Sequence, residues 1–187
     1  MNDNYYYQIS IQSKDKLAIG EYENCEFRDC NFSNNNLSDI IFVDCNFYNC
    51  NLSLAIISNT SFRNINFKNC KLLGLQFNSC NEFGLSYQFD ACQLNHSSFY
   101  RKNIKNTIFK NSQLQEVDFS GADLSNSIFE NCNLELATFE NTLLEYSDFR
   151  TSYNYSICPE TNRIKKAKFS IYGLEGLLDK YDIIIEK

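Results

Sequence analysis

The sequence predicts a solenoid, a rod of stacked coils, and three observations lead to that prediction. A large apolar residue returns every five positions, from Tyr22 to Phe77 and again from Phe89 to Phe149. The position two residues before each of these centres, here termed the slot, is mostly Cys, Ala, Ser or Thr. The other three positions of each unit are mostly polar. A period of five fits neither a helix nor a flat strand, whereas fixed self-similarity is typical of one stacked unit.

The centres also indicate how the units stack. From Phe89 to Phe149 they alternate between Phe and Leu or Ile. If four units form one coil, residues 20 apart lie above one another. Identical rings would then form offset aromatic stacks at strand spacing. The predicted columns are Phe27, Phe47 and Phe67 in the first half, and Phe89, Phe109, Phe129 and Phe149 in the second, facing Phe99, Phe119 and Phe139.

The chain divides into three predicted parts. Residues 1–16 form an N-terminal cap segment, residues 17–157 form the solenoid, and residues 158–187 form a C-terminal cap and dimerisation module. We expect the nine cysteines to be reduced and buried, because most of them occupy slots and none forms a CxxC motif. A metal site is not expected, since the lone His96 cannot complete a Cys/His set.

The period slips once, over residues 78–88, because Phe77 and Phe89 lie 12 residues apart. One interpretation is a two-residue bulge that the coil absorbs. The other is a projecting loop that carries function, as insertions on regular scaffolds often do. The candidate loop residues are Glu82, Phe83, Gly84, Leu85, Ser86, Tyr87 and Gln88.

An acidic band lies between Asn111 and Phe149, a window without Lys, Arg or His. Four of its glutamates directly follow four successive centres, which would place one carboxylate on each side of a four-sided coil. The band is either the solvated surface of the rod or a surface that attracts a DNA-binding groove as duplex DNA does. The candidate partner-binding residues are Glu116, Asp118, Asp123, Glu130, Glu135, Glu140, Glu145 and Asp148.

The C-terminal segment changes its periodicity. Four apolar residues at i, i+3, i+4 and i+7 predict a short helix behind an N-cap at Ser170. Three isoleucines then predict a final strand. This module either closes the apolar end of the rod or pairs two subunits. The candidate dimerisation residues are Leu174, Leu177, Leu178, Tyr181, Ile183, Ile184 and Ile185.

Units such as CNFSN, CNFYN, ADLSN and CNLEL resemble those of the pentapeptide-repeat proteins, over about residues 17–150. The resemblance implies an all-β fold, a right-handed quadrilateral β-solenoid, with a short C-terminal helix. The C-terminal segment resembles that of Qnr-type quinolone-resistance proteins and microcin immunity (McbG-like) proteins. It thus implies a homodimer that binds DNA gyrase or topoisomerase IV and protects it from quinolones or peptide poisons, without a cofactor. Qnr proteins of Gram-negative bacteria carry larger loops, which this chain lacks.

Composition excludes several other classes. The net charge of −6 argues against direct nucleic-acid binding. The N-terminal residues contain no apolar run that would serve as a signal peptide or a membrane span, so a cytoplasmic protein is expected. One His and the lack of a Gly-rich phosphate loop argue against an enzyme. The alternative to the topoisomerase hypothesis is a structural or scaffold repeat protein with an unrelated protein partner.

Overall fold

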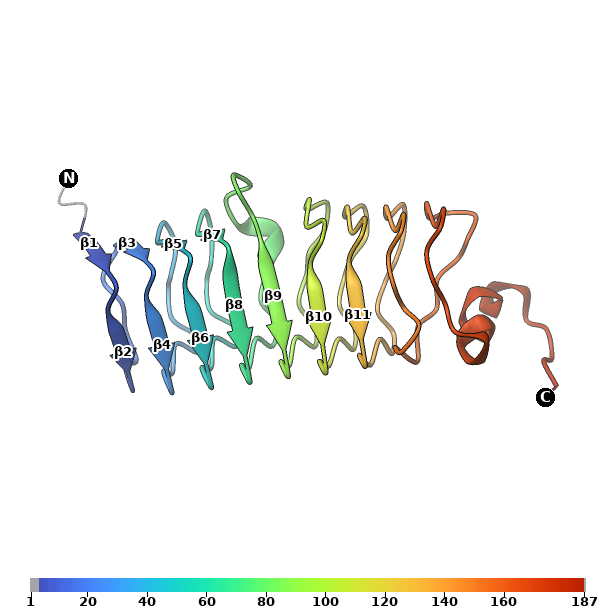
Figure 1. Cartoon of the computed structure of the whole chain (residues 1–187), viewed down its shortest axis with the longest axis horizontal. Coiled ribbons are helices and arrows are strands. Elements are labelled where there is room, and N and C mark those ends of the chain that lie inside the picture. The colour runs from blue at the N-terminus through green and yellow to red at the C-terminus, as the bar shows by residue number, and fades with distance from the viewer. Residues whose placement is uncertain (1–3, 187) are drawn as a thin grey trace.

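The computed structural model describes residues 4–186, which form a straight rod with the two ends of the chain at opposite tips (Figure 1). The predicted fold class, an all-β quadrilateral β-solenoid with a short C-terminal helix, is confirmed. Its elements are β1 (Asn4–Tyr7), β2 (Ser10–Gln12), β3 (Gly20–Glu23), β4 (Glu26–Arg28), β5 (Ile41–Val43), β6 (Asn46–Tyr48), β7 (Ser61–Arg63), β8 (Ile65–Lys68), η1 (Phe77–Ser79), β9 (Tyr87–Asp90), β10 (Ile108–Lys110), β11 (Ile128–Glu130), η2 (Ile171–Leu177) and η3 (Asp179–Tyr181).

Two parallel sheets cover two adjoining faces of the rod. One sheet has the order β1-β3-β5-β7, and the other has the order β11-β10-β9-β8-β6-β4-β2. The register sets Phe27 opposite Phe47 and Phe109 opposite Phe129, so residues 20 apart stack as predicted. The remaining two faces are joined by isolated parallel bridges, such as Gln113 with Asn133. Each unit therefore contributes one side of a coil, and each coil pairs only with its neighbours.

Aromatic columns fill the interior. The rings of Phe109 and Phe129 stack with centroids 4.9 Å apart, and those of Phe129 and Phe149 stack 4.5 Å apart. Across the core, Phe109 meets Phe119 edge to face at 5.8 Å. Every one of these centres is fully buried. Each contributes roughly 1.5–3 kcal/mol by burial, which accounts for the regular return of large apolar residues.

The corners of the coil carry a left-handed residue two positions after most centres. Asn24, Asp29, Asn34 and Asp39 have φ between 52° and 62° at four successive corners. Asn and Asp adopt this conformation more readily than other side chains, which explains the many asparagines in the sequence. Their side chains also bond from coil to coil, as in the 3.0 Å contact from Asn49 Nδ2 to Asp29 Oδ1.

Eight of the nine cysteines are buried and unpaired, as predicted. Each thiol lies against carbonyl oxygens, as when Cys132 Sγ donates to Phe109 O at 3.4 Å. Burial raises the pKa of Cys45 and of Cys132 to about 12, so both remain thiols. The exception is Cys158, which is half-buried and lies beyond the regular repeats. The described residues contain no cluster of three or more groups suited to a metal ion.

The coils extend beyond both predicted boundaries of the solenoid. At the N-terminal end, Tyr6 on β1 pairs with Tyr22 and Ile11 on β2 pairs with Phe27, so residues predicted as a cap segment already form the first coil. At the other end, Phe169 stacks on Phe149 at 5.4 Å. The boundary expected at residue 157 therefore lies inside the last coil, because the irregular segment rejoins the columns after it.

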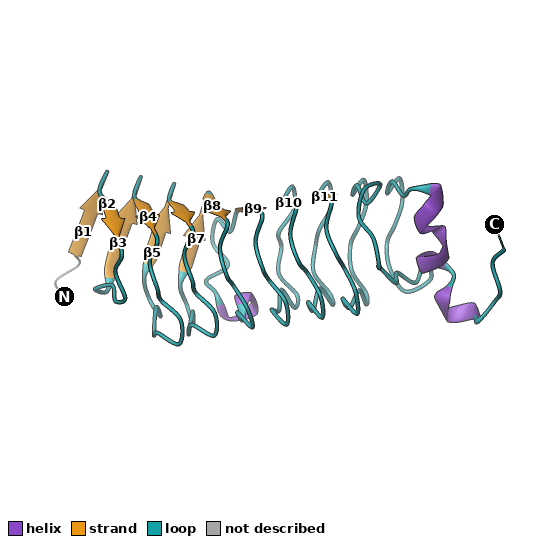
Figure 2. Cartoon of the chain, turned by 90° about the horizontal axis from the view of Figure 1, so that it is seen from below, coloured by secondary structure: helices purple, strands orange, loops and turns teal. Residues whose placement is uncertain are grey.

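The C-terminal segment differs from its prediction. Ser170 caps the helix as expected and accepts a hydrogen bond from Tyr172 N at 3.3 Å. However, the helix is of the 3-10 type and splits into η2 and η3, which lie across the end of the rod (Figure 2). The strand expected at Ile183–Ile185 is wrong, since residues 182–186 form no regular element. An isolated terminal strand has no neighbouring edge to pair with here.

Close packing explains why η2 stops the rod. Tyr155 is buried under it, and Ile157 N donates to Gly176 O at 2.8 Å. A Cβ at residue 176 would lie 1.9 Å from the carbonyl oxygen of Tyr155, so only glycine permits this approach. No helix within residues 4–186 is long and apolar enough to cross a membrane.

Candidate interaction surfaces

The acidic band encircles the rod, as the spacing predicts. Glu130 ends β11 on one face, and Glu135, Glu140 and Glu145 follow at the next three units, one on each remaining face. Three of the four side chains are exposed and Glu145 is half-buried. The geometry therefore presents carboxylates in all four directions, and no cleft lies among them that would suit acid–base catalysis.

Basic residues from outside the band neutralise half of its carboxylates. Lys105, Lys110 and Arg163 reach along the rod from neighbouring coils, whereas Arg150 lies two residues after Asp148. These ion pairs are Lys105–Asp123 at 3.0 Å, Lys110–Glu130 at 3.0 Å, Arg163–Glu145 at 3.0 Å and Arg150–Asp148 at 2.7 Å. Sequence reasoning missed the first three pairs because their partners, 18–20 residues apart, are close only once four units close a coil.

The ion pairs affect protonation in the expected direction. A hydrogen bond from Arg150 lowers the pKa of Asp148, and one to Glu130 raises the pKa of Lys110. Burial acts to raise the pKa of Asp123, but hydrogen bonds from Ser125 and Lys105 outweigh it and lower the pKa. The lowered pKa values of Asp123 and Asp148 and the raised pKa of Lys110 each favour the charged form.

The negative charge of the other four carboxylates is not neutralised by a neighbouring Lys or Arg among the described residues. We name these four the free acidic patch: Glu116, Asp118, Glu135 and Glu140. Within residues 4–186, the last three have no Lys, Arg or His within salt-bridge distance, and Glu116 meets only His96 at 3.2 Å. All four lie on or beside the two faces that the named sheets leave uncovered. Negative potential is thus concentrated on one side of the band.

Leu136 lies at the corner between Glu135 and Glu140. Its side chain is 74% exposed and its φ is 57°, in a column of corners that Asn34 and Glu116 occupy in other coils. A leucine in this conformation is uncommon because its Cβ crowds the backbone. The free acidic patch therefore surrounds a projecting apolar side chain, which sequence reasoning could have noticed as a leucine at a corner position.

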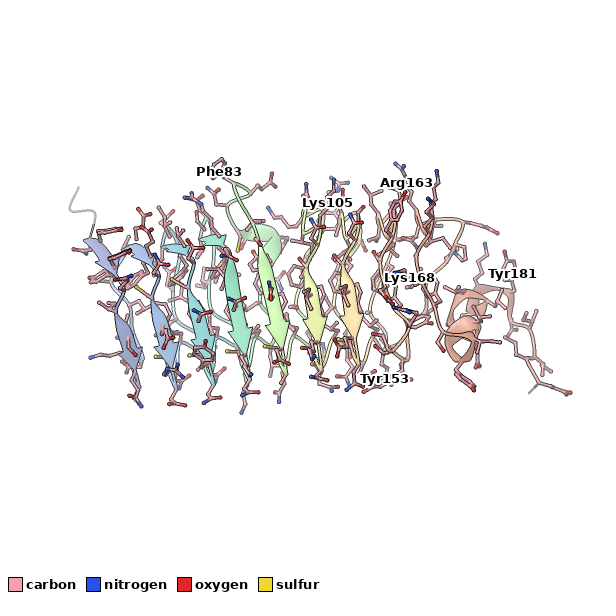
Figure 3. The ribbon with its side chains drawn as sticks, in the orientation of Figure 1. Phe83, Lys105, Tyr153, Arg163, Lys168 and Tyr181 are labelled. Carbon is pink, nitrogen blue, oxygen red and sulfur yellow. The ribbon has the colours of Figure 1, made fainter. Side chains whose placement is uncertain are left out.

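The slip at residues 78–88 is both a bulge and a loop. The register resumes at β9 after two extra residues, with Phe67 opposite Phe89. Between η1 and β9 the chain forms a loop that projects beyond the neighbouring coils (Figure 1), and Phe83 lies at the tip of this loop (Figure 3). Of the predicted loop residues, Glu82, Phe83, Gly84 and Ser86 are exposed, while Leu85 is half-buried. Tyr87 and Gln88 belong to β9 instead.

Tyr87 has an unexpected role. It occupies a slot, where most other units carry a smaller residue, and it is 2% exposed. The projecting loop removes one centre from this coil, and the Tyr87 ring fills the space between Phe62, at 5.9 Å, and Phe77, at 5.3 Å. The Tyr87 ring thus compensates for the missing centre from inside the core.

The C-terminal module leaves apolar side chains in solvent. Tyr172 is 89% exposed and Ile184 is 90% exposed, and Leu174, Tyr181, Ile183 and Ile185 are each between 43% and 55% exposed. Leu177 and Leu178 are half-buried, and Leu177 packs against the core. The predicted dimerisation residues thus divide between closing the rod and forming an uncovered apolar surface.

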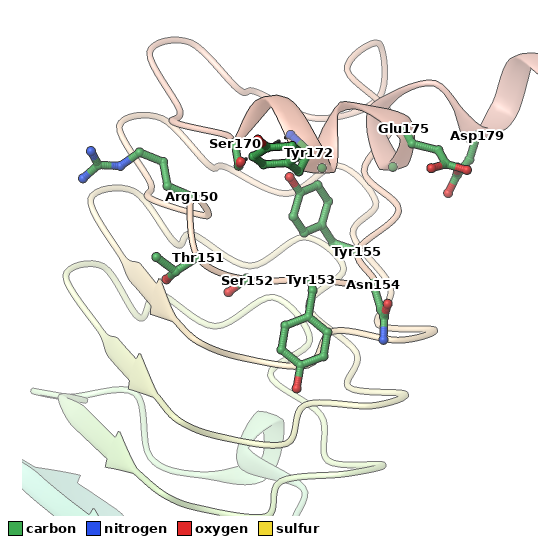
Figure 4. Close-up of a pocket in the computed structure, with 12 residues that line it drawn as sticks. Arg150, Thr151, Ser152, Tyr153, Asn154, Tyr155, Ser170, Tyr172, Glu175 and Asp179 are labelled. Carbon is green, nitrogen blue, oxygen red and sulfur yellow. Dashed lines mark hydrogen bonds between the residues drawn. The ribbon is translucent and has the colours of Figure 1, made fainter. Parts of the chain in front are cut away.

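A hollow of about 580 Å³ lies between the last coil and η2 (Figure 4). Tyr153 and Asn154 line it from the coil, while Tyr172, Glu175 and Asp179 line it from the helices. Its walls are mostly polar, and it is continuous with the exposed surface of the C-terminal module. No group in it is arranged as a nucleophile with a base, so it offers shape and hydrogen bonds and no evident chemistry.

Comparisons with known proteins agree with this architecture. A family model described as pentapeptide repeat region matches residues 76–149, and one described as pentapeptide repeats (8 copies) matches residues 25–64 and 45–81. Together they span residues 25–149. No curated protein matches the sequence significantly.

Among solved structures, two trypsin-treated variants of QnrB1, each described as a plasmid-mediated fluoroquinolone resistance protein, resemble this one. The first is 18% identical, with a TM-score of 0.65 and 98% of each chain covered. The second is 17% identical, with a TM-score of 0.64, covering 99% of this chain and 100% of the other. Full-length QnrB1 is 15% identical, with a TM-score of 0.55, covering 96% and 100%. At such identities the similarity shows the fold alone.

Proposed function

Because this chain belongs to the pentapeptide-repeat family, we propose that it is a non-enzymatic interaction protein that binds DNA gyrase or topoisomerase IV and protects the enzyme from quinolones or peptide poisons. The fold shared with QnrB1 over nearly the whole of both chains supports this proposal. The observation that carries it here is the free acidic patch, whose carboxylates are displayed on a rigid rod with a fixed repeat.

The mechanism rests on charge and rigidity. Duplex DNA attracts its enzymes through regularly spaced phosphates, and a cationic DNA-binding groove attracts any regular anionic rod in the same way. Glu116, Asp118, Glu135 and Glu140 come from two neighbouring coils, which lie roughly 4.8 Å apart along the rod axis. The parallel backbone bonds hold them in place, so little conformational entropy is lost on binding.

A supercoiling assay tests this function. DNA gyrase would be inhibited with ciprofloxacin, with and without the purified protein. Restored supercoiling at protein concentrations comparable to the enzyme is the expected result. Inhibition without rescue would indicate gyrase binding by a regulator rather than a protector. No effect over a broad concentration range, on gyrase and on topoisomerase IV, would contradict the proposal and favour the scaffold alternative with an unrelated partner.

We further propose that the protein is a homodimer joined through its C-terminal module. The exposed apolar side chains of η2, η3 and residues 183–185 support this, because a single tip that carries so much uncovered apolar surface is typical of an interface. Light scattering at micromolar concentration is expected to give twice the 21.8 kDa chain mass. A monomer mass would contradict the dimer without touching the topoisomerase proposal.

A further inference from the structure

The projecting loop, Asn81–Ser86, is held in place by residues of two neighbouring coils. At its start Asn81 N donates to Thr60 O at 3.1 Å, and at its end Ile65 N donates to Ser86 O at 2.9 Å. Asn81 Oδ1 accepts a hydrogen bond from Phe83 N at 2.9 Å, which folds the tip into a turn. Hydrogen bonds thus hold the start, the end and the tip of the loop within the chain itself.

Lys102 ties the loop from one side. It occupies a slot in the following coil, where the same column carries Thr60, Ala122 and Thr142, and it is 6% exposed. Its Nζ donates to Cys80 O at 3.1 Å and to Glu82 Oε1 at 2.9 Å. Removing an ammonium group from water costs several kcal/mol unless it is fully partnered. The presence of a lysine in this slot is therefore explained by its hydrogen bonds to Cys80 O and to Glu82 in the loop.

Arg63 supports the tip from the other side. Its guanidinium carbon lies 5.0 Å from the centre of the Phe83 ring, in the geometry of a cation–π contact. Within residues 4–186 no carboxylate lies within salt-bridge distance of it, so the ring is its principal contact. Gly84, with φ 70°, lets the chain turn over the arginine stem, since a Cβ there would lie 3.3 Å from Arg63 Cγ.

The supported ring is nonetheless mostly in water. Phe83 is 73% exposed at the outermost point of the loop (Figure 3). A lone exposed apolar residue on a protein surface needs no explanation. Here, however, a buried lysine, a stacked arginine and a side-chain-bonded turn all hold one aromatic ring away from the rod. Rigid aromatic side chains bind partners with little entropic loss, which makes them common interface anchors.

We propose that Phe83 is an anchor that inserts into an apolar socket of the partner protein, and that Lys102 and Arg63 are positioning residues that keep it ready to bind. The local charge supports an apolar rather than a cationic receptor, because two cations accompany the single carboxylate of Glu82. The inference rests on the proposed function in that the partner is the same topoisomerase, contacted here at a second point away from the free acidic patch.

The chain contains no tryptophan, so Phe83→Trp introduces a single tryptophan at the tip, whose fluorescence can be excited apart from that of the tyrosines. The fluorescence anisotropy of this tryptophan is expected to match a side chain that tumbles with the whole rod. The anisotropy is expected to fall when Lys102→Thr is added, because the loop then becomes more mobile. Threonine is the matched replacement because Thr60 and Thr142 occupy the same column. An unchanged anisotropy would overturn the positioning role of Lys102. Circular dichroism of both proteins checks that the solenoid is intact.

Binding to purified DNA gyrase then tests the anchor. Phe83→Ser is expected to weaken binding at least ~10-fold, as for a truncated hot spot, and Lys102→Thr several-fold. Tyr100→Ser, which removes another exposed aromatic side chain, is the control and should change little. If all three variants bind as the parent does, the anchor is overturned while the proposed function stands. If the parent protein itself does not bind gyrase, both fail together.

Discussion

At the scale of single residues, the corner position restricts which amino acids can occur, and the apolar period does not reveal this restriction. Every coil needs left-handed residues, and most corners carry Asn or Asp because these side chains tolerate a positive φ. Leu136 is an exception that combines this conformation with 74% exposure. Its side chain contributes little burial to offset the unfavourable backbone. Leu136 therefore adopts this conformation at a cost in stability, as does Leu54, which is 61% exposed in the same column of corners.

Leu136→Asn is expected to stabilise the fold by roughly 1 kcal/mol, because asparagine relieves the left-handed strain and little apolar contact is lost. Thermal unfolding followed by circular dichroism measures the change. Leu134→Asn, at a fully buried centre two residues earlier, is the contrasting control and should be strongly destabilising. A lower melting temperature for Leu136→Asn would show that the leucine packs usefully.

Thiol reactivity distinguishes Cys158 from the slot cysteines. Backbone N–H groups of Glu160 and Thr161 lower the pKa of Cys158, whereas burial raises the pKa of Cys45 and Cys132 to about 12. A lowered pKa means more thiolate at a given pH, so Cys158 should react with Ellman's reagent at a lower pH than a free cysteine does. We expect one fast thiol in the native protein and nine in denaturant. Cys158→Ser should abolish the fast phase, and a fast phase that survives this change would contradict the assignment.

At the scale of elements, the irregular segments hold together through contacts that replace the missing repeats. Tyr87 restores the core volume that the loop removes, and Lys102 fills its slot by bonding to the loop. The end of the rod is closed by η2, which approaches Tyr155 so closely that two glycines are needed. Each of these residues departs from the five-residue pattern, and each departure marks a place where packing differs from an ordinary coil.

Gly176→Ala is expected to displace η2, because the added Cβ would collide with the carbonyl of Tyr155 and disrupt the Ile157 N–Gly176 O hydrogen bond. Overpacking of this kind costs about 1–3 kcal/mol. Hydrogen exchange at the Ile157 amide measures the displacement, and light scattering would show whether dimerisation depends on η2. Leu174→Ala, at an exposed position of the same helix, should leave Ile157 protected. Equal protection in both variants would contradict the role assigned to Gly176.

At the scale of the whole molecule, coil closure determines how the charges combine. The sequence identifies the eight acids of the band, but it does not show which of them are paired with a basic residue. Closure brings Lys105, Lys110 and Arg163 against three of the acids, and Arg150 pairs locally with a fourth. Within the band, one side therefore has carboxylates without a Lys or Arg partner in the described part of the chain, and the loop that presents Phe83 lies at a different point along the rod.

Reversing Asp118, Glu135 and Glu140 to Lys is expected to weaken gyrase binding at least ~10-fold and to reduce its dependence on salt, because these residues carry the uncompensated field. Reversing Asp15, Glu21 and Glu26 near the other end gives the same change in net charge and is the control. Binding and salt dependence would be measured by titration at several ionic strengths. Equal losses in both variants would show that total charge matters rather than the patch.

The sequence by itself predicted a coil that turns at each unit, since two residues in five face inward, and the resemblance to a known family implied that the coil has four sides. The register of the structure confirms that residues 20 apart stack. The sequence also located the acidic band, the slip at residues 78–88 and the helical end. Only the tertiary structure decided which carboxylates remain free, how Lys102 and Arg63 hold Phe83, and how glycines seat η2 on Tyr155. The physical reason is one of range. Periodicity reports which way each side chain faces, whereas ion pairs, cation–π contacts and close packing depend on atoms that meet only after neighbouring coils stack.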